Sequence, residues 1–252
     1  MFRLLAGLST ACLLSLGTSA RAADDQPKDI LEKAIKAHGG EELMTKYKAG
    51  ITKSKGKITV PGVGEVEFSQ ETAYMIPDKF KESIQMTING MNINVITRIV
   101  GDKNSIEVNG KEMDVPEALK DALKNAGHMI KVAKLVPLLK EKGFELSLIG
   151  VEKIEDKPAI GIRVTAKDQK DINLYFDKKT NMMVKMEFRS TDPFTQKECN
   201  EERIILEYGK DKEGLATPKK VLIKHDNEKF LELEVSEIEF LEKLDESEFK
   251  KP

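Results

Sequence analysis

Apolar and polar residues alternate along much of this chain, which is the pattern of β-strands that bury one face. The clearest example is the segment 79–89, whose apolar face is interrupted only by Glu82. Together with the preceding segment, 66–76, it would present a set of large apolar side chains on one face: Phe68, Tyr74, Phe80, Ile84, Met86 and Ile88. Asn-Gly pairs at 89–90 and 109–110 predict tight hairpin turns, because both central positions of such turns need a positive φ.

The second half of the chain returns to this alternation after a helical stretch. Its expected strands are 144–151, 159–165, 172–177, 182–189, 204–208, 218–225 and 230–240. In the last of these the apolar positions change parity near Ser236, which predicts a β-bulge. The whole chain would then have about eleven or twelve strands. An antiparallel sheet of this length is expected to curl toward a barrel, which also protects its edges.

Three segments have helical periodicity. The first two, 27–37 and 41–47, are separated by a Gly-Gly pair. The third runs from Glu117 to about Lys142 and contains Gly127 and Pro137, which weaken or interrupt a helix. Its apolar stripe consists of Leu119, Ala122, Leu123, Ala126, Ile130, Ala133 and Val136. A single amphipathic helix between two blocks of strands is expected to cover an open face of the sheet.

The first 22 residues resemble a secretory signal peptide. Arg3 precedes a short apolar run, and Ala20 and Ala22 are the small residues that a signal peptidase requires. The run is too short for a transmembrane anchor, which needs about 20 apolar residues. Cys12 leaves a membrane-anchored lipoprotein open as the alternative. We therefore expect a signal peptide at 1–22, a single domain at 23–252, and a periplasmic location.

Charge and cysteine content narrow the range of functions. Without its first 22 residues the chain loses two arginines, and its formal net charge falls from −2 to −4. Because nucleic-acid binding depends on a concentrated basic surface, we expect no nucleic-acid partner. Cys199 would be the one remaining cysteine, so no internal disulfide could form and burial of apolar surface must hold the domain together.

The sequence contains no motif typical of catalysis. Cys199 is expected in a polar loop, where its acidic neighbours would raise the pKa of the thiol and make it unreactive. His38, His128 and His225 lack the spacing of a helical metal site. We therefore expect no catalytic residue, no metal and no cofactor, and interpret the chain as a protein that is not an enzyme.

The remaining functional candidate is the apolar interior of the curled sheet. A sheet of about eleven strands encloses more space than side chains readily fill, and methionine side chains adapt to ligands of different shape. We expect an apolar cavity for acyl chains, lined by Phe68, Tyr74, Phe80, Ile84, Met86, Ile88, Leu119, Leu123 and Ile130. The alternative is the same scaffold with a filled core and a functional outer face.

Four segments resemble bacterial outer-membrane lipoprotein-sorting proteins of the LolA/LolB type. They are Ile-Lys-Ala-His-Gly-Gly at 35–40, Tyr-Met-Ile-Pro-Asp-Lys-Phe-Lys at 74–81, and the stretches 173–185 and 244–252. The resemblance covers most of the chain after the export signal, and its motifs mainly specify turns and strand edges. It implies a mainly β (α+β) fold, an incomplete antiparallel β-barrel of about 11 strands lidded by helices, whose apolar cavity receives lipoprotein acyl chains.

Two functional hypotheses follow from these observations. The first is a periplasmic binder or carrier of lipid or lipoprotein acyl chains, in which the helix from Leu119 to Val136 acts as a displaceable lid and membrane contact is peripheral or transient. The second is an envelope interaction protein that uses the outer face of the same scaffold to bind another envelope protein.

The signal-peptide interpretation predicts how the chain is processed. The exported protein should begin at Ala23, because Ala20 and Ala22 occupy the two positions that the peptidase inspects. N-terminal sequencing of protein purified from a bacterial periplasm measures this directly. A diacylated N-terminus at Cys12 would instead assign the chain to the membrane-anchored lipoproteins.

Overall fold

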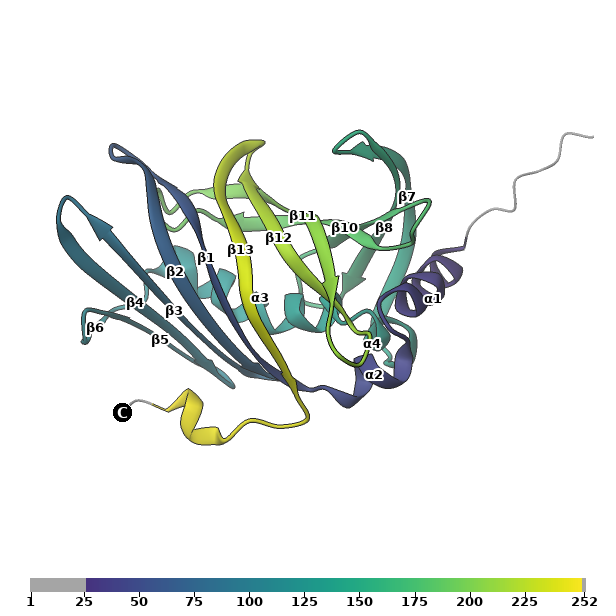
Figure 1. The fold of residues 1–252 in the computed structure, drawn as a ribbon, viewed down its shortest axis with the longest axis horizontal. Coiled ribbons are helices and arrows are strands. Elements are labelled where there is room, and N and C mark those ends of the chain that lie inside the picture. The colour runs from purple at the N-terminus through teal and green to yellow at the C-terminus, as the bar shows by residue number, and fades with distance from the viewer. Residues whose placement is uncertain (1–25, 251–252) are drawn as a thin grey trace, which may run out of the picture.

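The computed structural model describes residues 26–250, apart from the side chains of residues 121, 122 and 124, so the expected signal peptide lies outside the described residues. Within them, a single antiparallel sheet of 13 strands curls around a group of helices (Figure 1). The strands are β1 (Ala49–Val60), β2 (Gly64–Met75), β3 (Lys79–Ile88), β4 (Met91–Val100), β5 (Lys103–Val108), β6 (Lys111–Met113), β7 (Phe144–Ile154), β8 (Lys157–Ala166), β9 (Ile172–Asp177), β10 (Met183–Thr191), β11 (Glu198–Lys210), β12 (Ala216–His225) and β13 (Glu228–Leu241). The helices are α1 (Pro27–Ala37), α2 (Glu41–Lys46), α3 (Glu117–Ala133), α4 (Val136–Lys140) and the 3₁₀ helix η1 (Glu246–Phe249).

The strand order shows how the chain builds this sheet. From β1 in the middle the chain proceeds through neighbouring hairpins to β6 at one edge, and from β7 at the other edge it returns to β13, which pairs with β1. The β1–β13 ladder joins the two halves and contains the expected bulge. Lys53 faces Glu237 and Ser54 faces Val235, so Ser236 is the extra residue.

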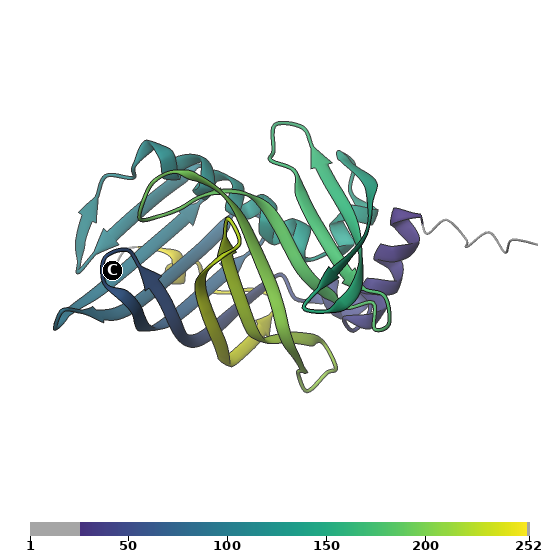
Figure 2. The same ribbon diagram turned by 90° about the horizontal axis from the view of Figure 1, so that it is seen from above.

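Helices α3 and α4 carry the chain from one edge of the sheet to the other (Figures 1 and 2). Helix α3 contacts both β5 and β10, which belong to opposite halves of the sheet. It therefore crosses the mouth of the curled sheet on its concave side. The expected long helix is interrupted just before Pro137, because Leu135 has a φ of 57° and separates α3 from α4.

The expected turns are confirmed, whereas the strand count and one strand boundary are corrected. Asn89 and Asn109 both have a φ of 50°, and the glycine after each also has a positive φ. The sheet has 13 strands, more than the eleven or twelve expected. Strand β11 begins at Glu198 instead of Ile204, because its charged first half pairs with neighbouring strands, as in the Arg189–Glu198 ion pair of 3.0 Å.

The main hydrophobic core fills one half of the curled sheet. Helices α1, α2 and α4 pack against the concave face of β8, β9 and β10. The fully buried side chains of this core include Leu31, Val132, Leu135, Ile162, Val164 and Leu174. This half of the barrel is therefore closed by protein side chains.

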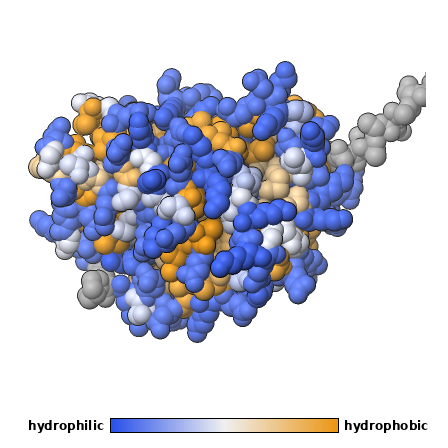
Figure 3. All heavy atoms as spheres, viewed as in Figure 1, coloured by the Kyte–Doolittle hydropathy of each residue, from blue (hydrophilic) through white to orange (hydrophobic). Residues whose placement is uncertain are grey.

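The other half of the sheet is less completely covered. On the concave face of β1 and β2, Ile58, Val60, Val66 and Phe68 are buried and form a second cluster. Their neighbours on β3, at positions 84, 86 and 88, are only partly buried. On the convex face Phe249 of η1 is buried in a separate small cluster, so the C-terminal segment crosses the outside of the sheet. The face seen in Figure 1 is mostly hydrophilic, with separated hydrophobic patches (Figure 3).

Lys134 fixes the C-terminal end of α3 to the sheet. Its ammonium group donates hydrogen bonds to the backbone carbonyl of Tyr47 at 3.3 Å and to the hydroxyl of Tyr74 at 3.2 Å. It also lies over the rings of Tyr74 and Phe240, 5.2 and 5.6 Å from their centroids. No carboxylate among the described residues forms an ion pair with it, and burial lowers its pKa to about 8.

Replacing Lys134 with methionine should stabilise the protein at pH 7 by about 1–3 kcal/mol, because a desolvated ammonium group without a carboxylate destabilises the folded state. The folded-state pKa of about 8 lies below the ordinary value of 10.5, so the penalty is complete below pH 8 and disappears as the pH rises toward 10.5. Urea unfolding at pH 7 and about pH 10 measures the difference between variant and parent.

Lys55→Met, on the exposed face of β1, is the matched control and should change stability by less than about 0.5 kcal/mol. If Lys134→Met lowers stability at pH 7, the two hydrogen bonds of Lys134 outweigh its desolvation, contrary to this prediction.

Candidate functional site

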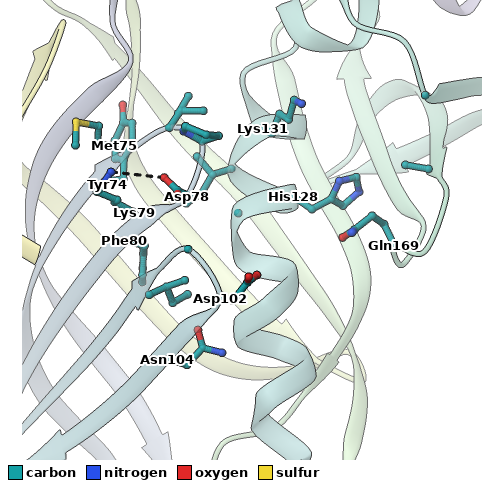
Figure 4. Close-up of a pocket in the computed structure, with 18 of the residues that line it drawn as sticks. Tyr74, Met75, Asp78, Lys79, Phe80, Asp102, Asn104, His128, Lys131 and Gln169 are labelled. Carbon is teal, nitrogen blue, oxygen red and sulfur yellow. Dashed lines mark ion pairs between the residues drawn. The ribbon is translucent and has the colours of Figure 1, made fainter.

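A cavity of about 810 Å³ opens where α3 crosses the ends of the strands (Figure 4). Its walls are α3, the turn between β2 and β3, the turn between β4 and β5, and the neighbouring ends of β7 and β8. Cavities that bind small ligands in proteins typically measure roughly 300–1,000 Å³. The space is therefore large enough for a ligand.

The floor of the cavity is apolar and continuous across three strands. Tyr74 on β2 pairs with Phe80 on β3, and Phe80 pairs with Ile99 on β4. Ile130 of α3 and Phe144 at the start of β7 add apolar surface on the opposite side. The result is an apolar slot between the helix and the sheet.

Gly127 brings α3 close to the β2–β3 turn. A Cβ atom at this position would lie 3.4 Å from the carbonyl oxygen of Pro77 and would meet no other atom within 4 Å. Gly127 also lines the cavity, so the space beside it is open. The sequence suggested that this glycine weakens the helix, and the structure adds that it leaves room in the cavity wall.

The rim of the cavity is rich in lysine. Two aspartates, Asp78 and Asp102, line the cavity together with five lysines: Lys79, Lys120, Lys131, Lys142 and Lys167. Lys79 lies 3.7 Å from Asp78, the ion pair drawn in Figure 4. The cavity is thus more positive than the chain as a whole, whose formal net charge is −2.

Two buried polar atoms at the cavity have no hydrogen-bond partner among the described residues: His128 Nε2 and Gln169 Oε1. His128 stacks on Phe144 with 6.1 Å between ring centroids. Burial, followed by the nearby charge of Lys131, lowers the pKa of His128, so the imidazole is neutral at pH 7. Buried polar atoms are nearly always paired in proteins, so this end of the cavity is suited to a polar ligand group or water.

A polar band crosses the concave face between this cavity and the second apolar cluster. Ser54 on β1 donates a hydrogen bond to Gln70 on β2 at 3.2 Å, and Gln70 donates in turn to Glu82 on β3. Burial raises the pKa of Glu82. Glu82, the one exception to the alternation of its strand, is therefore part of a defined polar feature.

The opposite wall contributes charged groups that face this band. Arg203 donates a hydrogen bond of 2.6 Å to Glu201, and its guanidinium group lies over the ring of Phe188. Burial would raise the pKa of Glu201, but Arg203 and His225 outweigh this effect and hold it at about 2. His225 is also 2.9 Å from Asp192. These pairs tie the turn after β10 to β11 and β12.

The residues expected to line one cavity fall into three groups in the structure. Tyr74, Phe80 and Ile130 line the cavity described above. Beyond the polar band, four others belong to the second apolar cluster: Phe68, Ile84, Met86 and Ile88. Leu119 and Leu123 are partly buried on α3 and are not among the cavity-lining residues.

The polar residues of the cavity were not predicted from the sequence. His128 was considered only as a metal ligand, and the lysines and Gln169 were not considered at all. Most of them lie in or beside turns. Gly101 and Gly143, which have positive φ, mark two of these turns. A glycine can reveal a turn in a sequence, but it does not show which turns meet at one end of a barrel.

Cys199 lies in β11 and is 3% exposed, which corrects its expected position in a polar loop. Burial and the charges of Glu201, Asp226 and Asp192 raise its pKa to about 11, the expected direction. The described residues contain no cluster of three or more side chains that could hold a metal ion. Among the helices of the same residues, none is long and apolar enough to cross a membrane.

Comparison with known proteins gives a likeness of fold. No family model and no curated protein matches the chain. A LolA superfamily protein from Nitrosomonas europaea, NE2245, is similar with a TM-score of 0.56 and 11% identity, over 89% of this chain and 97% of that one. A DUF1329 family protein from Desulfovibrio piger has a TM-score of 0.51 and 12% identity, with the same coverage. The chain therefore has the fold seen in the LolA superfamily, as its sequence segments suggested.

Proposed function

We propose that the protein is a non-catalytic binder of lipid or lipoprotein acyl chains. The acyl chain would enter the cavity beneath α3. The observation that carries this proposal is the cavity of about 810 Å³ with a continuous apolar floor from Tyr74 to Ile99. The similarity of fold to a LolA superfamily protein supports it.

An acyl chain in this slot would lie between the sheet and α3. Each methylene group removed from water contributes about 0.8 kcal/mol, so a handful of buried methylenes suffices for reversible binding. Entry and release require a small displacement of α3. Its C-terminal end is fixed by Lys134, whereas Gly127 interrupts the side-chain packing in its middle. We therefore propose that α3 is the displaceable lid.

The proposed location follows from the expected signal peptide at residues 1–22. An exported acyl-chain binder would work in the periplasm, between two membranes that contain lipids and lipoproteins. Transfer of an acyl chain to or from a lipid bilayer would require only peripheral or transient contact between the protein and the membrane.

Filling the cavity from Gly127 tests the proposal. Gly127→Leu should weaken binding of an uncharged fluorescent probe, N-phenylnaphthylamine, by about tenfold or more, because excluding two methylene equivalents removes about 1.6 kcal/mol. Gly127→Ala is the matched control, since its Cβ makes an ordinary contact with Pro77 and leaves the slot open.

Neither substitution should lower the free energy of unfolding, because both raise helix propensity by roughly 0.5–1 kcal/mol. If Gly127→Leu is folded and binds the probe as tightly as the parent, the ligand does not occupy this cavity.

The second candidate is the envelope interaction protein. It is favoured by the edge strand β7, on which Leu148, Ile149 and Val151 are 44%, 39% and 58% exposed. An exposed apolar edge strand is a template for pairing with another chain. On this hypothesis the concave face would be filled throughout, as it is between α1, α4 and β8–β10.

Substituting two isoleucines, one in each half of the sheet, and comparing the losses of stability distinguishes an open half from a filled one. Ile162→Ala in the main core should lower the free energy of unfolding by about 2–5 kcal/mol, because Ile162 is fully buried. Ile84→Ala should cost less than half as much, because Ile84 is partly exposed and loses fewer contacts. Urea denaturation measures both. Equal losses would favour the filled core.

A further inference from the structure

We propose that the cavity beneath α3 selects single-chain amphiphiles with an anionic head group, a carboxylate or a phosphate, which it holds at its lysine-rich end. This inference rests on the proposed function and adds the charge and the orientation of the ligand. It is carried by the placement of the lysines and by two unpartnered polar atoms.

The lysines without an ion pair lie at one end of the cavity. Lys142 and Lys167 flank the β7–β8 ladder where Phe144 pairs with Ala166, and neither forms an ion pair with any other described residue. By contrast, Lys120 pairs with Glu117, Lys131 pairs with Glu141, and Lys79 lies 3.7 Å from both Asp78 and Glu246. Uncompensated positive charge is therefore concentrated at the start of β7.

The two unpartnered polar atoms lie at this same end. Figure 4 shows His128 and Gln169 close together on one side of α3, with Lys131 above them. The neutral imidazole of His128 can donate a hydrogen bond from Nε2. Rotation of the Gln169 amide exchanges its unpaired oxygen for an NH₂ donor. Both side chains can therefore donate to the oxygens of a carboxylate or a phosphate.

The opposite side of α3 is suited to the apolar tail. Figure 4 shows Phe80 and Asn104 on that side, with Asp102 beside them. The negative charge of Asp102 disfavours an anionic head group there, whereas the apolar floor accepts methylene groups. Gly127, next to His128, adds no side chain of its own, and a Cβ atom there would meet only the carbonyl oxygen of Pro77 within 4 Å. A single ligand could then run from the apolar slot to the lysines.

The test uses three amphiphiles with the same dodecyl tail and different heads: dodecanoate, dodecyl phosphate and dodecyltrimethylammonium. Each competes with N-phenylnaphthylamine at low ionic strength, where charge contributes most. Dodecanoate and dodecyl phosphate should bind at least about fivefold more tightly than the cationic amphiphile, and this preference should shrink as salt is added.

The double variant Lys142→Gln/Lys167→Gln should lose about fivefold in affinity for the two anionic amphiphiles while the affinity for the uncharged probe stays within about twofold. Lys55→Gln/Lys153→Gln, two exposed lysines on β1 and β7 outside the cavity, is the matched control and should bind all ligands as the parent does.

Each other outcome identifies what is wrong. If the probe binds but all three heads compete equally, the anionic selectivity is wrong and the proposed function stands. If inorganic phosphate displaces dodecyl phosphate as effectively as dodecanoate does, the site binds free anions. The proposal that its ligand is an amphiphile is then wrong. If neither the probe nor any amphiphile binds the folded parent, the proposed function itself fails.

Discussion

The pairing of β1 with β13 is the constraint on which the rest of the structure depends. It joins residues almost 200 positions apart, as in the pair Ala49–Leu241, and connects the two halves of the sheet. The approach of the two backbones is close at Gly56, where a Cβ atom would overlap the carbonyl oxygen of Glu232. Ser236 forms the bulge in this ladder and donates a hydrogen bond to Lys53. A bulge increases local twist, which helps the sheet to curl.

Curling of the sheet explains why a helix lies across its mouth. The strand order leaves β6 and β7 at opposite edges, so the segment between them must cross from one edge to the other. Crossing on the concave side brings α3 into contact with β5 in one half and with β10 in the other. The short α4 then completes the core of the β8–β10 half, where Leu135 and Leu138 are buried. The cavity remains where α3 meets the β2–β3 and β4–β5 turns and the ends of β7 and β8.

Local signals in the sequence predicted local structure well. The alternation over 79–88, the Asn-Gly turns and the parity change at Ser236 each concern a few neighbouring residues, and each is confirmed. The start of β11 was missed because its charged side chains are satisfied by partners on other strands. The cavity was predicted only in part for a similar reason, since its walls are turns brought together by the register of the sheet. Glu82 breaks the alternation of its strand in the sequence, but its partner is not apparent there. The register places Thr72 opposite Glu82, and Gln70 donates to Glu82 from the next position on the same face of β2.

The curled sheet is divided into a filled half and a partly open half. Side chains of α1, α2 and α4 supply the close packing that holds one half together, so the other half can keep unfilled space beside α3 without unfolding. The polar band from Ser54 to Glu82 lies on the same concave face, beyond the cavity-lining pair Tyr74 and Phe80. Because buried polar groups are retained only where their hydrogen bonds are satisfied, an apolar chain that entered beneath α3 would stop at this band. In the proposed function this band would limit the length of the bound tail, and the polar part of the ligand would lie toward the lysine-rich end.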